Sequence, residues 1–332
     1  VGVATVLSIS LVVLWFLSSR RFVLVNLTED TCRWDGQLDI PIHYEPRIGV
    51  HMVTVGIGVG PGRFRNVKCV LDTGSRHLTV ARSALGRVED GTWIPVAGPS
   101  FIHYGTQTDA VRWVEAPVRV SGRRVCHDMR NVTLAGAGER KCRGAGCFNV
   151  LGLSVGAGAT VPFLTQLARH AGVRPTFCIA MRRNGTGSLR INHECADRNA
   201  RRIRLLDHPQ WYLVRLDGVV CRGTDDRPVA SCPSRLMVDT GSNQLGGRPD
   251  FFRALRTTLR PGDALVFRLR DTADNAFEYV VPPSAYTHAG HLLFDPHQES
   301  DNDVLVLGSM FMRGFQLTVD VAARELAVSA NI

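Results

Sequence analysis

The chain has 332 residues, which is long enough for two lobes. Of these residues 45% are hydrophobic and 21% are charged, a composition that excludes general disorder. The formal net charge of +9 comes almost entirely from arginine, because only Lys68 and Lys141 are lysines. A positive charge can indicate nucleic-acid binding, but these arginines are scattered singly or in pairs and match no nucleic-acid-binding module, so we expect no nucleic-acid partner.

The first residues form an uncharged run. Residues 1–17 read VGVATVLSISLVVLWFL, and Arg20 and Arg21 follow shortly after. The run approaches the roughly 20 apolar residues that cross a bilayer, and it lacks the small-residue cleavage site of a signal peptide. We therefore predict a transmembrane or signal-anchor segment at residues 1–19, with a buried helix as the alternative. A stalk or short pro-region is predicted at residues 20–47.

The sequence contains opposing signals about the side of the membrane on which the rest of the chain lies. Arg20 and Arg21 favour a cytosolic position for the rest of the chain. Nine cysteines and the N-x-S/T sequons favour the opposite side; the sequons begin at Asn26, Asn131 and Asn184. We expect a single-pass membrane protein of the secretory pathway, the endomembranes or the cell surface, with its folded domain luminal or extracellular.

The cysteine spacing predicts short disulfide-closed loops. Cys142 and Cys147 bracket the loop CRGAGC, and Cys221 and Cys232 flank an expected hairpin. No CxxC pair with histidine partners is present, so we expect no zinc site. The odd number of cysteines leaves at least one thiol unpaired, and we expect Cys69, which lies within an apolar strand, to be a buried free cysteine.

From residue 48 the pattern is typical of an all-β protein with a few short helices. Runs rich in Val, Ile, Leu and Thr predict strands at 51–59, 66–72, 111–120, 210–221, 264–270 and 315–321. Helices are predicted at residues 161–171 and 249–259, both beginning near a proline. We place a lobe boundary near residue 203, giving an N-terminal lobe at 48–203 and a C-terminal lobe at 204–332.

One glycine-rich stretch imitates a dinucleotide fingerprint. Gly56, Gly58, Gly60 and Gly62 are spaced like such a motif, but a strand rather than a helix follows them. A phosphate site needs a strand followed by a helix N-terminus, so the stretch predicts a hairpin turn.

The tetrapeptide Asp-Thr-Gly-Ser occurs twice, at residues 72–75 and 239–242, each time behind apolar residues. A plain turn would explain either copy alone, but one aspartate at the end of a buried strand is a costly buried charge. Two aspartates that meet across a pseudo-twofold interface cannot both ionise, so one pKa rises and the pair holds a single proton. Such a dyad contains both an acid and a base, which is enough to hydrolyse an amide without a metal or a covalent intermediate.

These loops and the motifs around them resemble those of pepsin-like aspartic proteases (family A1). SFIHYGTQT at 100–108 resembles the flap hairpin that closes over substrate, and NVLGL at 149–153 resembles the element that supports the first loop. VLVLGSMFMRGFQLTVDVAARELAVS at 304–329 is similar to the C-terminal signature. The resemblance implies an all-β, bilobal, pepsin-like fold with pseudo-twofold symmetry, no cofactor and no metal. We also expect a monomer.

The resemblance assigns roles by matched position. Asp72 and Asp239 would form the catalytic dyad. The threonines would link the two loops, the serines would hydrogen-bond the carboxylates, and two distant glycines would pack behind. This support comprises Thr73, Gly74, Ser75, Thr240, Gly241, Ser242, Gly152 and Gly308, and the flap comprises Tyr104, Gly105 and Thr106.

The expected function is that of an aspartic endopeptidase acting on polypeptides and held to a membrane by its N-terminal segment. The chain also departs from the family's pattern. Thr79 stands where a tryptophan usually bonds the flap tyrosine, and Ser309 stands where an aspartate is frequent. The alternative is therefore a catalytically weak or inactive peptide-binding relative.

Overall fold

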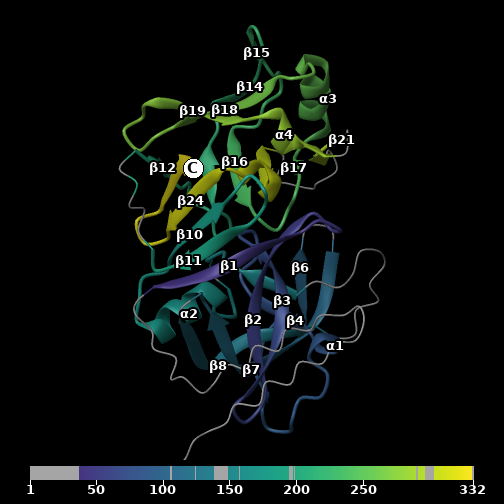
Figure 1. Ribbon diagram of the computed structural model, residues 1–332, viewed down its shortest axis with the longest axis vertical. Coiled ribbons are helices and arrows are strands. Elements are labelled where there is room, and N and C mark those ends of the chain that lie inside the picture. The colour runs from purple at the N-terminus through teal and green to yellow at the C-terminus, as the bar shows by residue number, and fades with distance from the viewer. Residues whose placement is uncertain are drawn as a thin grey trace, which may run out of the picture. The chain divides into compact units, whose positions relative to one another are not determined.

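The structure, a computed structural model, is dominated by strands, with short helices beside them (Figure 1). All described residues belong to one compact unit, Cys32–Ile332. The described residues are 37–104, 107–123, 125–137, 149–156, 158–193, 197, 199–288, 291–295 and 303–330.

The first half of the chain contains strands and two short helices. The strands are β1 (Leu38–Glu45), β2 (Val50–Gly60), β3 (Arg63–Asp72), β4 (Leu78–Ala81), β5 (Ile94–Pro95), β6 (Phe101–Tyr104), β7 (Gln107–Ser121), β8 (Cys126–Ala137), β9 (Asn149–Gly152), β10 (Thr176–Met181) and β11 (Gly187–Ile191). The helices are α1 (Arg82–Leu85) and α2 (Phe163–Ala171).

The second half contains shorter strands and sheets. The strands are β12 (Arg201–Arg204), β13 (Leu213–Arg215), β14 (Gly218–Arg222), β15 (Asp226–Pro228), β16 (Arg235–Asp239), β17 (Leu245–Gly246), β18 (Ala264–Arg270), β19 (Ala276–Val281), β20 (Thr287–His288), β21 (His291–Leu292), β22 (Phe294–Asp295), β23 (Val304–Gly308), β24 (Phe315–Asp320) and β25 (Glu325–Ala330). The helices are α3 (Pro249–Thr258), α4 (Pro283–Tyr286) and the 3-10 helix η1 (Ser309–Met312).

Each half contains the same three-strand arrangement. In the first, β3 runs parallel to β9 and β4 returns antiparallel to β9. In the second, β16 runs parallel to β23 and β17 returns antiparallel to β23. The two arrangements provide the predicted pseudo-twofold symmetry, and each one ends at an Asp-Thr-Gly-Ser copy.

One sheet joins the two halves. Strands from both ends of the chain lie in it in the order β12-β25-β24-β10-β11-β1, and it continues through β2 into the first half. The predicted lobe boundary near residue 203 falls within β12 and stays a prediction.

This sheet corrects the predicted stalk at residues 20–47. Leu38–Glu45 forms β1, which pairs with β11 and β2 and buries Leu38, Ile40 and Ile42. The sequence hid this strand because Pro41 breaks its pattern, and proline weakens a strand prediction. Residues 20–36 lie outside the described ranges.

The other predicted elements agree closely with the structure. Helices α2 and α3 match the predictions at 161–171 and 249–259, and α2 ends at Gly172, which has the left-handed backbone of a helix C-cap (φ 66°). The predicted strand at 210–221 is two strands, β13 and β14. The glycine-rich stretch forms the β2–β3 hairpin, as predicted.

The cysteines agree with the predictions only in part. Cys69 is a free, fully buried thiol, as expected, and burial raises its pKa. Cys221 and Cys232 are both free, so the predicted loop disulfide between them is wrong. Cys221 is fully buried within β14, and its side chain packs in the core instead of facing the turn. Cys142 and Cys147 lie outside the described ranges.

Within the described ranges, no helix has the length and apolar character that crossing a bilayer requires. The predicted membrane segment at residues 1–19 and the sequon at Asn26 lie outside those ranges. Asn131 and Asn184, which begin the other sequons, are both exposed.

Candidate active site

The two Asp-Thr-Gly-Ser loops meet at their aspartates. Asp72 ends β3 opposite Gly152 of β9, and Asp239 ends β16 opposite Gly308 of β23. The side chains of Asp72 and Asp239 lie within hydrogen-bonding reach of each other. The structure therefore brings together the two carboxyl groups that the sequence predicted to form a dyad.

Thr73 and Thr240 link the two loops through reciprocal hydrogen bonds. The backbone N–H of Thr73 donates to Oγ1 of Thr240 at 3.1 Å, and the backbone N–H of Thr240 donates to Oγ1 of Thr73 at 3.0 Å. The Thr73 hydroxyl in turn donates to the carbonyl of Val238 at 2.8 Å. Both threonines are buried, so these reciprocal bonds exclude water and fix the spacing of the loops.

Each loop requires a glycine, because the aspartate of the other loop lies too close for a side chain. A Cβ atom on Gly74 would lie 2.9 Å from Oδ1 of Asp239, and one on Gly241 would lie 2.4 Å from Cγ of Asp72. Behind the loops, a Cβ on Gly152 would lie 2.5 Å from the backbone nitrogen of His77. A Cβ on Gly308 would lie 2.2 Å from the carbonyl oxygen of Gln244. These glycines therefore pack where the resemblance placed them.

The two aspartates have unequal surroundings. Oδ1 of Asp72 accepts hydrogen bonds from the backbone N–H groups of Gly74 at 2.7 Å and Ser75 at 3.0 Å, and the Ser75 hydroxyl donates to Oδ2. Asp239 accepts the backbone N–H of Gly241 at 2.9 Å. The Ser242 hydroxyl donates to the carbonyl of Gln244 at 3.3 Å, so it does not hold Asp239 as predicted. A local bond to the serine's own turn competes successfully with the carboxylate.

This asymmetry separates the two pKa values. Burial raises the pKa of Asp239 well above its ordinary value, and the neighbouring Asp72 charge raises it further. Burial also raises the pKa of Asp72, but the hydrogen bonds from Ser75, Gly74 and Asp239 oppose that rise. The pair therefore holds a single proton, and these surroundings favour Asp239 over Asp72 as the carboxyl group that carries it.

The predicted flap is a hairpin of β6 and β7. Tyr104 ends β6 and lies opposite Gln107 in the strand register. Gly105 and Thr106 lie outside the described residues, and the backbone of Tyr104 is described without its side chain. The hairpin begins just after Pro99. An aromatic residue other than Tyr104 connects Pro99 to the Asp72 loop.

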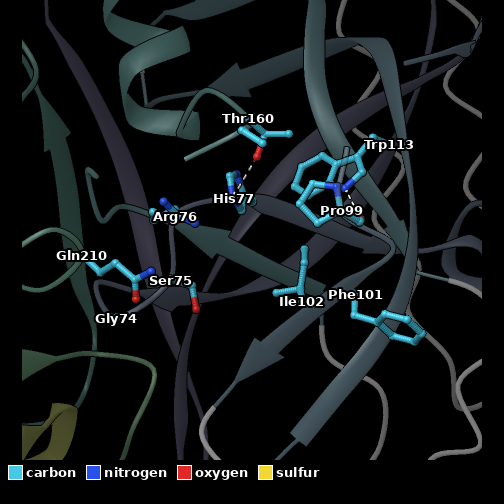
Figure 2. Close-up of a pocket in the computed structure, with 11 residues that line it drawn as sticks. Gly74, Ser75, Arg76, His77, Pro99, Phe101, Ile102, Trp113, Thr160 and Gln210 are labelled. Atoms are coloured by element: carbon cyan, nitrogen blue, oxygen red, sulfur yellow. Dashed lines mark hydrogen bonds between the residues drawn. The ribbon is translucent and has the colours of Figure 1, made fainter. Parts of the chain in front are cut away.

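That aromatic residue is Trp113 of β7, which sequence reasoning treated only as part of a strand. Its Nε1–H donates to the carbonyl of Pro99 at 2.6 Å, and its ring meets His77 edge to face at 4.8 Å (Figure 2). His77 shares a hydrogen bond of 3.3 Å with the hydroxyl of Thr160. Trp113 thereby connects the base of the hairpin to the Asp72 loop, while Thr79 lies buried nearby in β4. Only these side-chain contacts in the folded chain show this role, because Trp113 is far from the loop in sequence.

A cavity of about 310 Å³ lies between the Asp72 loop and the base of the hairpin (Figure 2). Gly74, Ser75, Arg76 and His77 line one end, and Trp113 belongs to the other. Burial, with a smaller contribution from the Arg76 charge, lowers the pKa of His77 to about 4, so the ring is neutral near pH 7. Among the described residues, no cluster of His, Cys, Asp and Glu could hold a metal ion.

No protein-family model matches the chain, and no curated protein matches it. Among solved structures, the chain is similar to basic 7S globulin from soybean, with a TM-score of 0.70 at 12% sequence identity. The similarity covers 89% of this chain and 95% of that chain. It shows that the chain has the mostly β, bilobal, pepsin-like fold predicted from the sequence. The globulin's name specifies no peptidase, so the likeness concerns the fold and not a reaction.

Proposed function

We propose that the protein is an aspartic endopeptidase that hydrolyses peptide bonds with the Asp72–Asp239 dyad. The observation that carries the proposal is the close approach of these two buried carboxyl groups, whose pKa values are both raised by burial but are affected unequally by their surroundings. A binding site alone would not need two aligned carboxyl groups at a desolvated position, whereas amide hydrolysis needs an acid and a base together.

In the proposed reaction, the Asp72 carboxylate accepts a proton from a water molecule as that water attacks the carbonyl carbon of the substrate. Asp239 donates its proton to the carbonyl oxygen, which gives a neutral tetrahedral diol. The proton held by Asp72 then passes to the amide nitrogen, the carbon–nitrogen bond breaks, and a hydroxyl proton returns to Asp239. Closure of the β6–β7 hairpin would exclude water and strengthen these electrostatic interactions.

The test is cleavage of an unfolded protein by the purified folded domain across pH 2 to 8. We expect an acid optimum, and we expect Asp72→Asn and Asp239→Asn each to lose at least about 1,000-fold in kcat/KM. Thermal unfolding of both variants verifies that they are folded. Retained activity in either folded variant would contradict the mechanism.

A second candidate is a peptide-binding protein without catalysis. Thr79 occupies the usual tryptophan position, and the Ser242 hydroxyl is directed to its own turn and not to Asp239. A peptide mimic with a hydroxyl at the scissile position separates the two functions. Tight binding of the mimic at acid pH without turnover of any peptide would favour the second candidate.

We further propose that residues 1–19 anchor the protein in a membrane with its folded domain luminal or extracellular. The uncharged N-terminal run and the exposed positions of Asn131 and Asn184 support this. The test is alkaline extraction of membranes from cells expressing the full chain, followed by glycosidase digestion. Release by alkali, or the absence of any glycan, would contradict the respective part of the proposal.

A further inference from the structure

The cavity beside Asp72 begins at the dyad itself. Gly74 lines it, and a Cβ atom on this glycine would lie 2.9 Å from Oδ1 of Asp239 and 3.2 Å from Oδ1 of Asp72. The far end reaches Phe101 and Ile102 of β6. Because an extended peptide advances about 3.3 Å per residue, a side chain one or two residues from the scissile bond would enter this space.

The walls of the cavity differ in chemistry. Pro99, Ile102 and Trp113 provide an apolar wall on the hairpin side (Figure 2). Polar side chains face them from the loops, namely those of Ser75, Thr160 and Gln210. A ligand group suited to both walls has a short hydrocarbon stem and a polar end.

Arg76 gives the cavity its charge. It is the one arginine or lysine among the described lining residues, which include no aspartate or glutamate. His77 is the neighbouring titratable group on the same loop, and its burial keeps it neutral above about pH 4. The dyad lies beyond Gly74 and contributes the nearby negative charge. A guanidinium at this place favours a carboxylate, which it can bind through two parallel hydrogen bonds.

The backbone around Arg76 is shaped for its side chain. A Cβ on Gly158 would lie 2.5 Å from Nη1 of Arg76, and one on Gly156 would lie 3.2 Å from Cδ. The Arg76 carbonyl accepts the N–H of Phe163, the first residue of α2, at 2.8 Å. The glycines therefore leave room for the arginine, and the helix start fixes its main chain.

From these contacts we infer that the cavity binds an acidic side chain of the peptide, with Arg76 as the specificity-determining residue. The methylene groups of a glutamate pack against Trp113 and Ile102, and its carboxylate pairs with Arg76. The inference rests on the proposed function for the presence of a peptide, and it adds the class of side chain close to the cut.

The test compares binding of paired peptides that carry a reduced, uncleavable bond at the scissile position. Each pair differs only by Glu or Gln at one position within two residues of that bond, on either side. At pH 6 we expect one position at which the Glu peptide binds about tenfold more tightly, as a charge-assisted pair requires. Arg76→Gln should remove this preference, so that the Glu and Gln peptides of that pair bind equally well. Arg253→Gln, an exposed arginine on α3, is the charge-matched control and should retain it.

A pH change provides a second readout that a merely structural arginine would not alter. At pH 3 the glutamate is mostly protonated, so the preference of the wild-type protein should fall towards unity. Equal binding of Glu and Gln peptides at every position at pH 6, or no binding of either, would overturn the inference. Glu-selective binding without cleavage of ordinary peptides would support the inference and contradict the proposed reaction. Cleavage without any Glu preference would support the proposed reaction and contradict the inference.

Discussion

Gly241 is a position at which a single methyl group should disable the dyad. A Cβ atom there would lie 2.4 Å from Cγ of Asp72, so Gly241→Ala must displace one of the carboxyl groups. We expect a loss of about 100-fold in kcat/KM, because displacements of about 1 Å have this effect on positioned groups. Gly218→Ala is the control, since a Cβ on Gly218 meets nothing within 4 Å. A fully active Gly241→Ala variant would contradict the loop geometry.

The serines should differ in their effect on the pH profile. The Ser75 hydroxyl donates to Asp72 and lowers its pKa, so Ser75→Ala should raise that pKa. The acid limb of kcat/KM, which reports ionisation of the base, should then move to higher pH. Ser242→Ala should leave the limb in place, because its hydroxyl donates to Gln244. Equal shifts in both variants would show that the two aspartates are not distinguished in this way.

The residues of the candidate site show what can be predicted locally. The two copies of one tetrapeptide, with the motifs around them, were enough to predict that Asp72 and Asp239 meet, because a pair of carboxyl groups needs both copies. The inequality of Ser75 and Ser242 could not be predicted, since both copies read Asp-Thr-Gly-Ser. It depends on turns that follow the tetrapeptide, where Ser242 bonds to Gln244.

At the scale of elements, Trp113 should control the hairpin above the site. Trp113→Phe keeps an aromatic ring against His77 but removes the N–H that donates to Pro99 at 2.6 Å. We expect KM to rise about fivefold with a smaller change in kcat, because the Pro99 carbonyl loses a hydrogen bond of about 1 kcal/mol and the base of the hairpin loosens. Trp93→Phe is the matched control, since Trp93 donates to Gly58 at 3.0 Å. Identical kinetics in the two variants would argue against a positioning role.

Elements with a strong local pattern were predicted with nearly correct limits. Helices α2 and α3 begin next to prolines and have clear apolar faces, so the sequence contains both their start and their orientation. Strand β1 was missed because Pro41 obscured an alternation that Leu38, Ile40 and Ile42 otherwise display. The predicted disulfide between Cys221 and Cys232 failed because spacing does not reveal that one of them lies in a buried strand.

At the scale of the whole molecule, one buried charge contributes to stability. Asp263 is 3% exposed, accepts the backbone N–H of Arg260 at 2.6 Å and pairs with the guanidinium of Arg227. Asp263→Ala leaves that arginine without its buried partner and should reduce the free energy of unfolding by about 3 kcal/mol. Urea denaturation measures the change. Asp207→Ala, in which a side chain 94% exposed is removed, should leave the free energy of unfolding nearly unchanged.

The same carboxylate should make stability depend on pH. Burial alone would raise its pKa, but the Arg260 N–H and Arg227 lower the pKa below its ordinary value. A lowered folded-state pKa gives stability that is present above the unfolded pKa, about 3.9, and is lost as the pH falls through the folded value. The difference between wild type and Asp263→Ala should therefore shrink in strong acid. A difference that grows as the pH falls would contradict this assignment.

Strand β10 pairs with a strand from each half of the chain, which matters for any attempt to express the halves separately. In β10, Phe177 faces Ile191 on one side and Val319 of β24 on the other. A fragment that ends at the predicted boundary near residue 203 would leave the β24-facing edge of β10 unpaired, and unpaired strand edges promote aggregation. The two halves should therefore be soluble only when they are expressed together, even though their loops are related by pseudo-twofold symmetry.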